Sequence, residues 1–359
     1  MKQDLLRQTL RNIVSAKALS LCDWDLLIRQ ARSADLLARL AAMLEQTNLL
    51  EHVPLQPRAH LESALVMAAA QSDAVRREVE YVRLALNPLG VEPILLKGGA
   101  YQMAALPASL GRLFTDLDIL VPQARLPEVE ATLMLSGWAT THHDPYDQRY
   151  YRRWMHELPP MLHIRRMTLL DVHHAIVPAT ADLKPSSAAL LASAIPLPGY
   201  PGVRVLAPAD MVLHSATHLF YNEEFSHGLR DMSDLDLLLR HFMQTPDFWT
   251  ILLERARELG LMRPMHYCLR YCLHLFSTPI PEHLLKQVET LGARGRTSRL
   301  MDKLWLKVLG SLHPSARDSG SAVAAQLLYL RAHWHRMPPW LLAYHLCMKS
   351  LRPRERTEA

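Results

Sequence analysis

One short segment constrains this chain more than any other, because residues 116–121 read Asp-Leu-Asp-Ile-Leu-Val. Acidic residues that alternate with apolar ones predict a β-strand, in which Asp116 and Asp118 point to one face and the apolar side chains to the other. Two carboxylates on one face repel each other, and aspartate is rare in strands. Spacing alone leaves two interpretations open: the face is solvated, or a divalent cation with oxygen ligands lies between the carboxylates.

An upstream segment has the form of a phosphate-binding turn. The apolar run at 91–96 predicts a strand, and it ends in Lys97-Gly98-Gly99 directly before a segment of helical composition. Glycines at this point would let a phosphate approach the backbone, and a helix N-terminus would supply oriented N–H groups. Lys97 would neutralise negative charge. The turn is a weak signal alone, but its combination with the Asp-x-Asp strand is a strong one.

Residues 91–178 predict a small mixed sheet with helices. The predicted elements are, in order, a strand at 91–96, a short helix at 100–105, a strand at 116–121, a helix at 124–136 and a hairpin with strands at 157–165 and 169–176. In the second hairpin strand Asp171 and His173 share one face.

Helical periodicity dominates both sides of this sheet. It runs through residues 5–51, with breaks near Asp23 and Ser33, and continues at 58–86 before the breaker sequence Asn-Pro-Leu-Gly at 87–90. After Pro178, helices are predicted at 209–221, 230–243, 247–259, 264–276, 281–291, 298–308 and 322–333. The fold class is therefore α+β. The predicted parts are an N-terminal helical region at 1–88, a core at 89–180, a C-terminal helical region at 181–351 and a disordered tail at 352–359.

Composition and charge bear on the partners and the location of the protein. Forty basic and thirty-five acidic residues give a net charge of +5, which neither indicates nor excludes nucleic acid as a partner. Four cysteines are too few for a disulfide framework, and they favour a reducing compartment. Charged residues interrupt the first thirteen positions, so no signal peptide is predicted, and no apolar stretch is long enough to cross a membrane. We therefore expect a cytoplasmic protein.

Together, the two motifs carry a resemblance to a known family. Leu-Leu-Lys-Gly-Gly at 95–99, followed by Gly-Arg-Leu-Phe-Thr-Asp-Leu-Asp-Ile-Leu-Val at 111–121, resembles the polymerase-β-like nucleotidyltransferase superfamily, especially its branch of uncharacterised bacterial nucleotidyltransferases. The close resemblance covers residues 91–176, and segments 214–218 and 230–240 are similar more loosely. The spacing from Gly99 to Asp116 is longer than usual for the superfamily, as this branch allows.

The resemblance implies a polymerase-β-like core at 89–180 and a reaction of the EC 2.7.7 type. It implies that Asp116, Asp118 and Asp171 bind two Mg²⁺ ions, or Mn²⁺, which hold a nucleoside triphosphate, ATP in the simplest case. Asp171 would help to deprotonate a hydroxyl of an unidentified acceptor, a small molecule or a protein. Lys97 and Arg112 would hold the β- and γ-phosphates, with Gly98 and Gly99 in the turn. Glu157 and Asp147 remain alternatives for the third carboxylate.

A small sheet cannot enclose both a triphosphate and an acceptor, so the helices after Pro178 are expected to form the opposite wall of the cleft. His218 and Glu224 on that wall, and His173 on the sheet, are candidate contacts to the base or the acceptor. His214 and His218 have the spacing of a zinc pair, but Ser215 stands where a metalloprotease helix has its glutamate. Histidines at helix contacts are the preferred interpretation.

Other polar groups are interpreted as structural. Cys268 and Cys272 are expected to be buried thiols, and Asp231, Asp234 and Asp236 are expected to cap a helix start. The segment 340–354 is expected to be a docking helix rather than an interfacial one.

Two other functional classes remain open. One is a non-catalytic nucleotide-binding or antitoxin-like regulatory protein that retains the fold, against which the intact Asp116, Asp118 and Lys97 argue. The other, a metal-dependent phosphohydrolase built on His214, His218 and Asp231, lacks an adjacent His-Asp pair.

Overall fold

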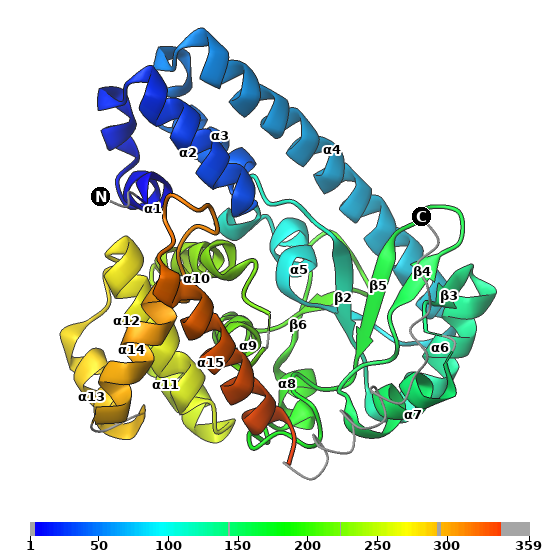
Figure 1. The fold of residues 1–359 in the computed structure, drawn as a ribbon. Helices are drawn as coiled ribbons and strands as arrows, with labels where there is room; N and C mark the ends of the chain where they lie inside the picture. The colour runs from blue at the N-terminus through cyan, green and yellow to red at the C-terminus, as the bar shows by residue number, and fades with distance from the viewer. Residues whose placement is uncertain (1–3, 143, 223, 293–295, 339–359) are drawn as a thin grey trace.

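The computed structural model describes residues 4–142, 144–222, 224–292 and 296–338. A sheet lies beside an N-terminal and a C-terminal group of helices, and the two groups also contact each other directly (Figure 1). The predicted α+β class is confirmed. Buried apolar side chains form one continuous core through all three parts, for example Leu40 in the N-terminal helices, Leu120 in the sheet and Leu235 in the C-terminal helices. The predicted tail at 352–359 and the segment 340–354 lie outside the described residues.

The N-terminal helices are α1 (Leu5–Arg11), α2 (Leu21–Ser33), α3 (Leu37–Gln46) and α4 (Leu55–Leu86). The long helix α4 reaches from the N-terminal helices to the sheet (Figure 1). The break predicted near Asp23 lies at residues 19–20, directly before α2, where Ser20 and Asp23 form the capping box that starts the helix. The break at Ser33 and the end of α4 at Leu86 are confirmed.

The sheet has seven strands in the order β3-β4-β5-β2-β1-β7-β6. The strands are β1 (Ile94–Leu95), β2 (Asp116–Leu120), β3 (Trp138–Thr140), β4 (Met161–His163), β5 (Leu169–His173), β6 (Ile195–Pro196) and β7 (Arg204–Val205). The predicted hairpin is confirmed by the antiparallel pairing of β4 with β5. The central strand β2 runs parallel to β5 and antiparallel to β1.

The sheet is larger than predicted, because β3 adds an unpredicted strand beside β4, and because β6 and β7 extend the sheet beyond residue 178 through parallel pairing of β7 with β1. Residues 195–205 therefore contribute strands to the sheet, although they were assigned to the C-terminal helical region. The boundaries at 88 and 180 stay predictions. Four helices connect the strands: α5 (Lys97–Met103), α6 (Leu126–Leu135), α7 (Pro145–Trp154) and α8 (Ser187–Ser193).

The C-terminal helices match the seven predicted segments. They are α9 (Pro208–Tyr221), α10 (Gly228–Phe242), α11 (Phe248–Glu258), α12 (Met262–Phe276), α13 (Glu282–Gly292), α14 (Arg296–Val308) and α15 (Ser319–Arg336). Their apolar faces pack on one another and on α1, which gives each helix its buried stripe. Within the described part of the chain, no helix combines the length and apolar character needed to span a membrane.

Candidate active site

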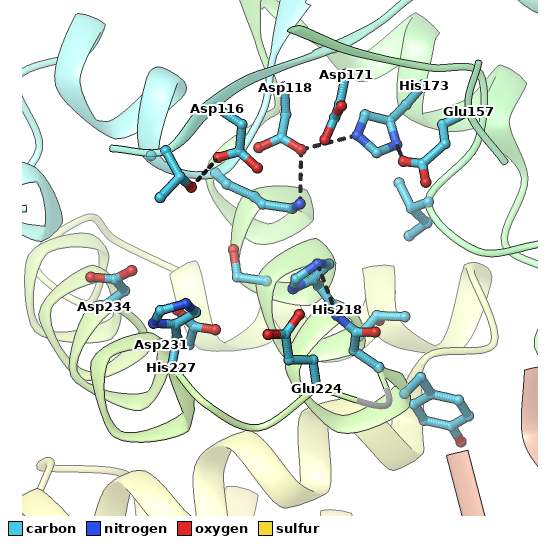
Figure 2. Close-up of a pocket in the computed structure, with 18 of the residues that line it drawn as sticks. Asp116, Asp118, Glu157, Asp171, His173, His218, Glu224, His227, Asp231 and Asp234 are labelled. Atoms are coloured by element: carbon cyan, nitrogen blue, oxygen red, sulfur yellow. Dashed lines mark hydrogen bonds and ion pairs between the residues drawn. The ribbon is translucent and has the colours of Figure 1, made fainter. Parts of the chain in front are cut away.

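A cleft with a volume of about 390 Å³ separates the sheet from helices α9 and α10. Figure 2 shows the sheet residues Asp116, Asp118, Asp171, His173 and Glu157 along one side, with side chains of the α9–α10 region opposite. The prediction that helices after Pro178 form the opposite wall is confirmed. Nine of the predicted site residues line the cleft: Lys97, Gly98, Arg112, Asp116, Asp118, Asp171, His173, His218 and Glu224.

Strand register places two carboxylates side by side in this cleft. Because β2 and β5 run parallel, Asp118 lies directly opposite Asp171. Asp118 is only 4% exposed; it accepts a hydrogen bond from Lys97 Nζ at 2.8 Å and lies 3.0 Å from His173 Nε2. Burial by itself would raise the pKa of Asp118, but the charges of Lys97 and His173 outweigh burial and hold this pKa well below its usual value.

The other two carboxylates have raised pKa values. Burial, and then the charge of Asp118, raise the pKa of Asp171 to about 7. The same two causes raise the pKa of Asp116, whose Oδ1 accepts a hydrogen bond from Thr115 Oγ1 at 2.9 Å. Burial and the neighbouring charge of Asp118 therefore both disfavour the ionised forms of Asp116 and Asp171.

Two overlapping groups of side chains in the described ranges have metal-binding geometry. In each group the ligand atoms lie within 4.8 Å of one another: one comprises Asp118, Asp171 and His173, the other His156, Glu157 and His173. His173 Nδ1 is 3.1 Å from Glu157 Oε2, so its ring is fixed between two carboxylates. Asp116 lines the cleft without belonging to either group. Asp147, the other candidate for the third carboxylate, lies in α7, and its side chain is outside the part of the chain that the structure describes.

The two glycines of the predicted phosphate turn permit close packing. A Cβ atom at Gly98 would lie 2.7 Å from Arg112 Nε and 3.1 Å from the ring of Phe114. A Cβ atom at Gly99 would lie 2.7 Å from Leu117 Cδ1, so Gly99 packs α5 against β2 and is not among the residues that line the cleft. Lys97 has a left-handed backbone, with φ of 44°, which directs its ammonium at Asp118.

Sequence reasoning missed a buried ionic cluster behind Arg112. Arg112 and Arg39 both form ion pairs with Asp234 of α10, and the Arg39 side chain is 1% exposed. Burial, and then the charge of Arg230, lower the pKa of each of these arginines to about 10. Arg39 also donates hydrogen bonds to the hydroxyl of Ser233 and to the backbone carbonyls of Ala108 and Leu110. The sequence contained one indication of this cluster: Arg39 lies on the apolar face of α3, where a charged side chain needs a buried partner.

Only one of the three aspartates interpreted as caps of α10, Asp231, lies where a carboxylate complements the dipole of this helix. Asp231 lies in the first turn of the helix, beside Arg230. For Asp234 and Asp236 the interpretation is wrong, because both are buried inside the structure. Asp236 accepts hydrogen bonds from Thr278 Oγ1 at 2.6 Å and from Arg240 Nε at 2.8 Å.

The two histidines of α9 differ in position. His218 lines the cleft, whereas His214 is buried and does not. Burial, and then the charge of Lys97, lower both pKa values, that of His214 to about 3. Neither belongs to a metal-binding group of the described residues, which agrees with the packing interpretation. Cys268 and Cys272 are buried free thiols, as predicted.

No curated protein matches the chain. A family model described as "Uncharacterised nucleotidyltransferase" matches residues 20–277, which include all seven strands and the cleft wall formed by α9 and α10. The helices α13, α14 and α15 follow the matched segment. Because the match covers well over half of the 359 residues, the chain belongs to this family of uncharacterised nucleotidyltransferases, and nucleotidyl transfer is its general class of activity.

Proposed function

We propose that this protein transfers a nucleoside monophosphate from a nucleoside triphosphate, ATP in the simplest case, to a hydroxyl of an acceptor and releases pyrophosphate. The reaction is of the EC 2.7.7 type. The observation that carries the proposal is the parallel pairing of β2 with β5, which sets Asp118 opposite Asp171 in a cleft that also holds Lys97 and Arg112. A polyphosphate with its metal ions requires carboxylates and cations in one cleft.

Magnesium fits the donor set of this cleft. Asp118 and Asp171 offer neighbouring carboxylate oxygens, the ligand type that Mg²⁺ prefers, and their mutual repulsion would be relieved by a cation. Two Mg²⁺ ions, or Mn²⁺, held by these residues with Asp116 beside them would neutralise the phosphates and make the acceptor hydroxyl more acidic. His173, held between Asp118 and Glu157, would fix the orientation of the Asp118 carboxylate.

Different residues of the cleft would bind the leaving pyrophosphate and the acceptor. Lys97 and Arg112 would bind the β- and γ-phosphates, because their cationic groups lie beside the Gly98 turn. The acceptor hydroxyl would lie at Asp171 and give its proton to that carboxylate. The oxygen of the acceptor hydroxyl would then form a bond to the α-phosphorus. The bond between this phosphorus and the oxygen that bridges it to the β-phosphorus would break, so pyrophosphate would leave on the side of Lys97.

The opposite wall would supply specificity. His218 and Glu224 face the carboxylates across the cleft (Figure 2), where they would contact the base or the acceptor. His218 is suited to this role as a neutral hydrogen-bonding group, because burial, and then the charge of Lys97, hold its pKa well below the usual value.

The test uses ATP labelled in either the α- or the γ-phosphate, with a cell extract as the source of acceptor. We expect the α-label, and not the γ-label, to enter a product when Mg²⁺ is present, and chelation to prevent both this transfer and tight ATP binding. Asp118→Asn and Asp171→Asn should lower transfer roughly a hundredfold or more, since each removes a ligand charge. Asp25→Asn is the matched control, because the Asp25 side chain is 65% exposed on α2.

Other outcomes would contradict the proposal in distinct ways. Transfer of the γ-label would indicate phosphoryl transfer. Equally tight ATP binding with chelator present would show that no metal is needed. ATP binding by the wild type without transfer of either label would favour the non-catalytic, antitoxin-like alternative.

A further inference from the structure

Helix α15 brings a cation to the cleft from outside the part of the chain that matches the family. Its last residue, Arg336, lines the cleft, whereas the family match ends at residue 277. The helix packs against α9 (Figure 1). The cleft of this protein therefore contains an arginine that the matched segment does not supply.

Several contacts fix the end of α15 in this place. The backbone carbonyl of Arg336 accepts a hydrogen bond from Thr180 Oγ1 at 2.6 Å. His335 is tied to Asp182 twice, through its carbonyl, which accepts from the Asp182 backbone N–H at 2.9 Å, and through Nδ1, 2.6 Å from Asp182 Oδ2. One turn earlier, Arg331 donates to the carbonyl of Phe220 at 3.1 Å. Arg336 is thus held by a docked helix, and its Nη1 reaches Asn222 Oδ1 at 3.4 Å.

Arg336 lies at the end of the cleft that is away from Arg112. Burial, then the charges of His173 and Arg336, lower the pKa of His156, which precedes Glu157 and whose ring centroid lies 5.3 Å from that of His173. Arg112, by contrast, forms an ion pair with Asp234, which Figure 2 shows on the side of Asp116, away from Glu157. The cleft therefore has a cationic group at each end, and the carboxylates lie between them.

Because the displacement is in-line, the triphosphate and the acceptor are expected at different ends of the cleft. The leaving pyrophosphate and the attacking oxygen lie on opposite sides of the α-phosphorus. Arg112 and the Gly98 turn lie together on one side, with Lys97 beside Asp118 in the middle, so the acceptor occupies the other side, where Arg336 lies. A guanidinium presents five N–H donors in a planar fork that matches a carboxylate or a phosphate.

We propose that the acceptor carries an anionic group, a carboxylate or a phosphate, which Arg336 binds while the acceptor hydroxyl lies at Asp171. This inference rests on the proposed nucleotidyl transfer, and it makes Arg336 a specificity-determining residue. The acceptor class is therefore a hydroxyl compound with a carboxylate or phosphate a few bonds from the reacting oxygen, rather than a cationic amine.

The test measures binding of inorganic phosphate and of acetate to protein saturated with Mg²⁺ and α,β-methylene-ATP, an analogue that fills the triphosphate end without reacting. Arg336→Gln should weaken binding of the anions at least tenfold and leave affinity for the analogue within twofold. Arg336→Lys keeps the positive charge but loses the planar fork of donors, so its affinity for the anions should lie between the affinities of the wild type and of Arg336→Gln. Arg257→Gln, on the exposed surface of α11, is the control that changes net charge equally.

Each result decides the question. If Arg336→Gln binds both anions as the wild type does, or instead loses affinity for the analogue, the proposal is overturned. If the wild type binds no analogue, the proposed nucleotidyl transfer fails, and the difference in anion affinity between wild type and Arg336→Gln still reports on Arg336. An unchanged urea midpoint for Arg336→Gln would exclude loss of folding as the cause of weaker binding.

Discussion

Asp234 forms ion pairs with two buried arginines. Its replacement by asparagine keeps the shape of the side chain but leaves the charges of Arg39 and Arg112 without their buried counter-charge. We expect Asp234→Asn to lower the free energy of unfolding by about 3–5 kcal/mol, the usual consequence of breaking a buried ion pair. Urea denaturation at neutral pH measures this change.

The matched comparison is Asp25→Asn, which removes an ion pair with Arg29 between side chains that are 65% and 54% exposed. This variant should change the free energy of unfolding by less than about 1 kcal/mol. If Asp234→Asn and Asp25→Asn changed the free energy of unfolding equally, burial of the Asp234 ion pairs would not add to their contribution to stability.

His214 makes the stability of the protein depend on pH. Burial lowers its pKa in the folded state to about 3, whereas the unfolded chain has the ordinary value near 6.5. Below pH 6.5 the unfolded state therefore binds a proton that the folded state does not, so the stability present above pH 6.5 is lost as pH falls. Between pH 7.5 and 5.5 this loss is about 1 kcal/mol.

We expect His214→Gln to lose less stability over this interval than the wild type does. Urea midpoints at the two pH values measure the difference, and the wild-type curve controls for the other buried histidines. Parallel pH curves for the two proteins would show that His214 already binds its proton in the folded state.

At this scale, the sequence predicts the residues whose chemistry follows from local spacing. Alternation along one strand predicted that Asp116 and Asp118 share a face, and only the combination with the Lys97-Gly98-Gly99 turn indicated a binding site there. The direct pairing of Asp118 with Asp171 depends on the register between two strands. Arg39 and Asp234 could not be paired in advance, because helical periodicity indicates which face is buried but not which distant helix covers it.

Among the elements, the loop before β2 is held against α3 by a glycine. Gly111 has φ of 59°, and a Cβ atom there would lie 2.4 Å from the backbone atoms of Ala38 and Arg39. Backbone cannot move aside as a flexible side chain can. We therefore expect Gly111→Ala to lower the free energy of unfolding by roughly 3 kcal/mol or more, from left-handed strain and overpacking together.

Gly90→Ala is the control for that change. Gly90 has a similar φ of 63°, but no atom lies within 4 Å of the Cβ position, so only the conformational strain of roughly 1–2 kcal/mol is expected. Urea denaturation of both variants separates strain from collision. Equal losses of stability would mean that the α3 backbone is not in the way.

Long amphipathic helices were predicted nearly to the residue, because their buried stripe repeats over several turns. The elements that were missed carry weaker local signals. Helix α7 is rich in tyrosine and arginine and has no continuous apolar stripe, and β6 and β7 are two residues long and depend on pairing with neighbouring strands. Tertiary partners, rather than local preference, determine such short strands.

For the molecule as a whole, the cleft is assembled from parts that are far apart in the sequence. The sheet supplies the carboxylates, α9 and α10 supply the opposite wall, and α15 supplies Arg336. The combination of a phosphate turn and an Asp-x-Asp strand predicted the first part and the need for the second. Nothing in the local sequence of α15 indicated that its end reaches the cleft, since a terminal arginine is also typical of a solvated helix end.

The cluster of Arg39, Asp234 and Arg112 has a consequence for motion. Many transferases open and close by rotating rigid parts about a hinge. A rotation that separated α3 from α10 would pull two arginines from a buried carboxylate before water could replace it, at a cost of several kcal/mol. The N-terminal and C-terminal helices should therefore move as one rigid frame, so that substrates enter through displacement of smaller segments around it.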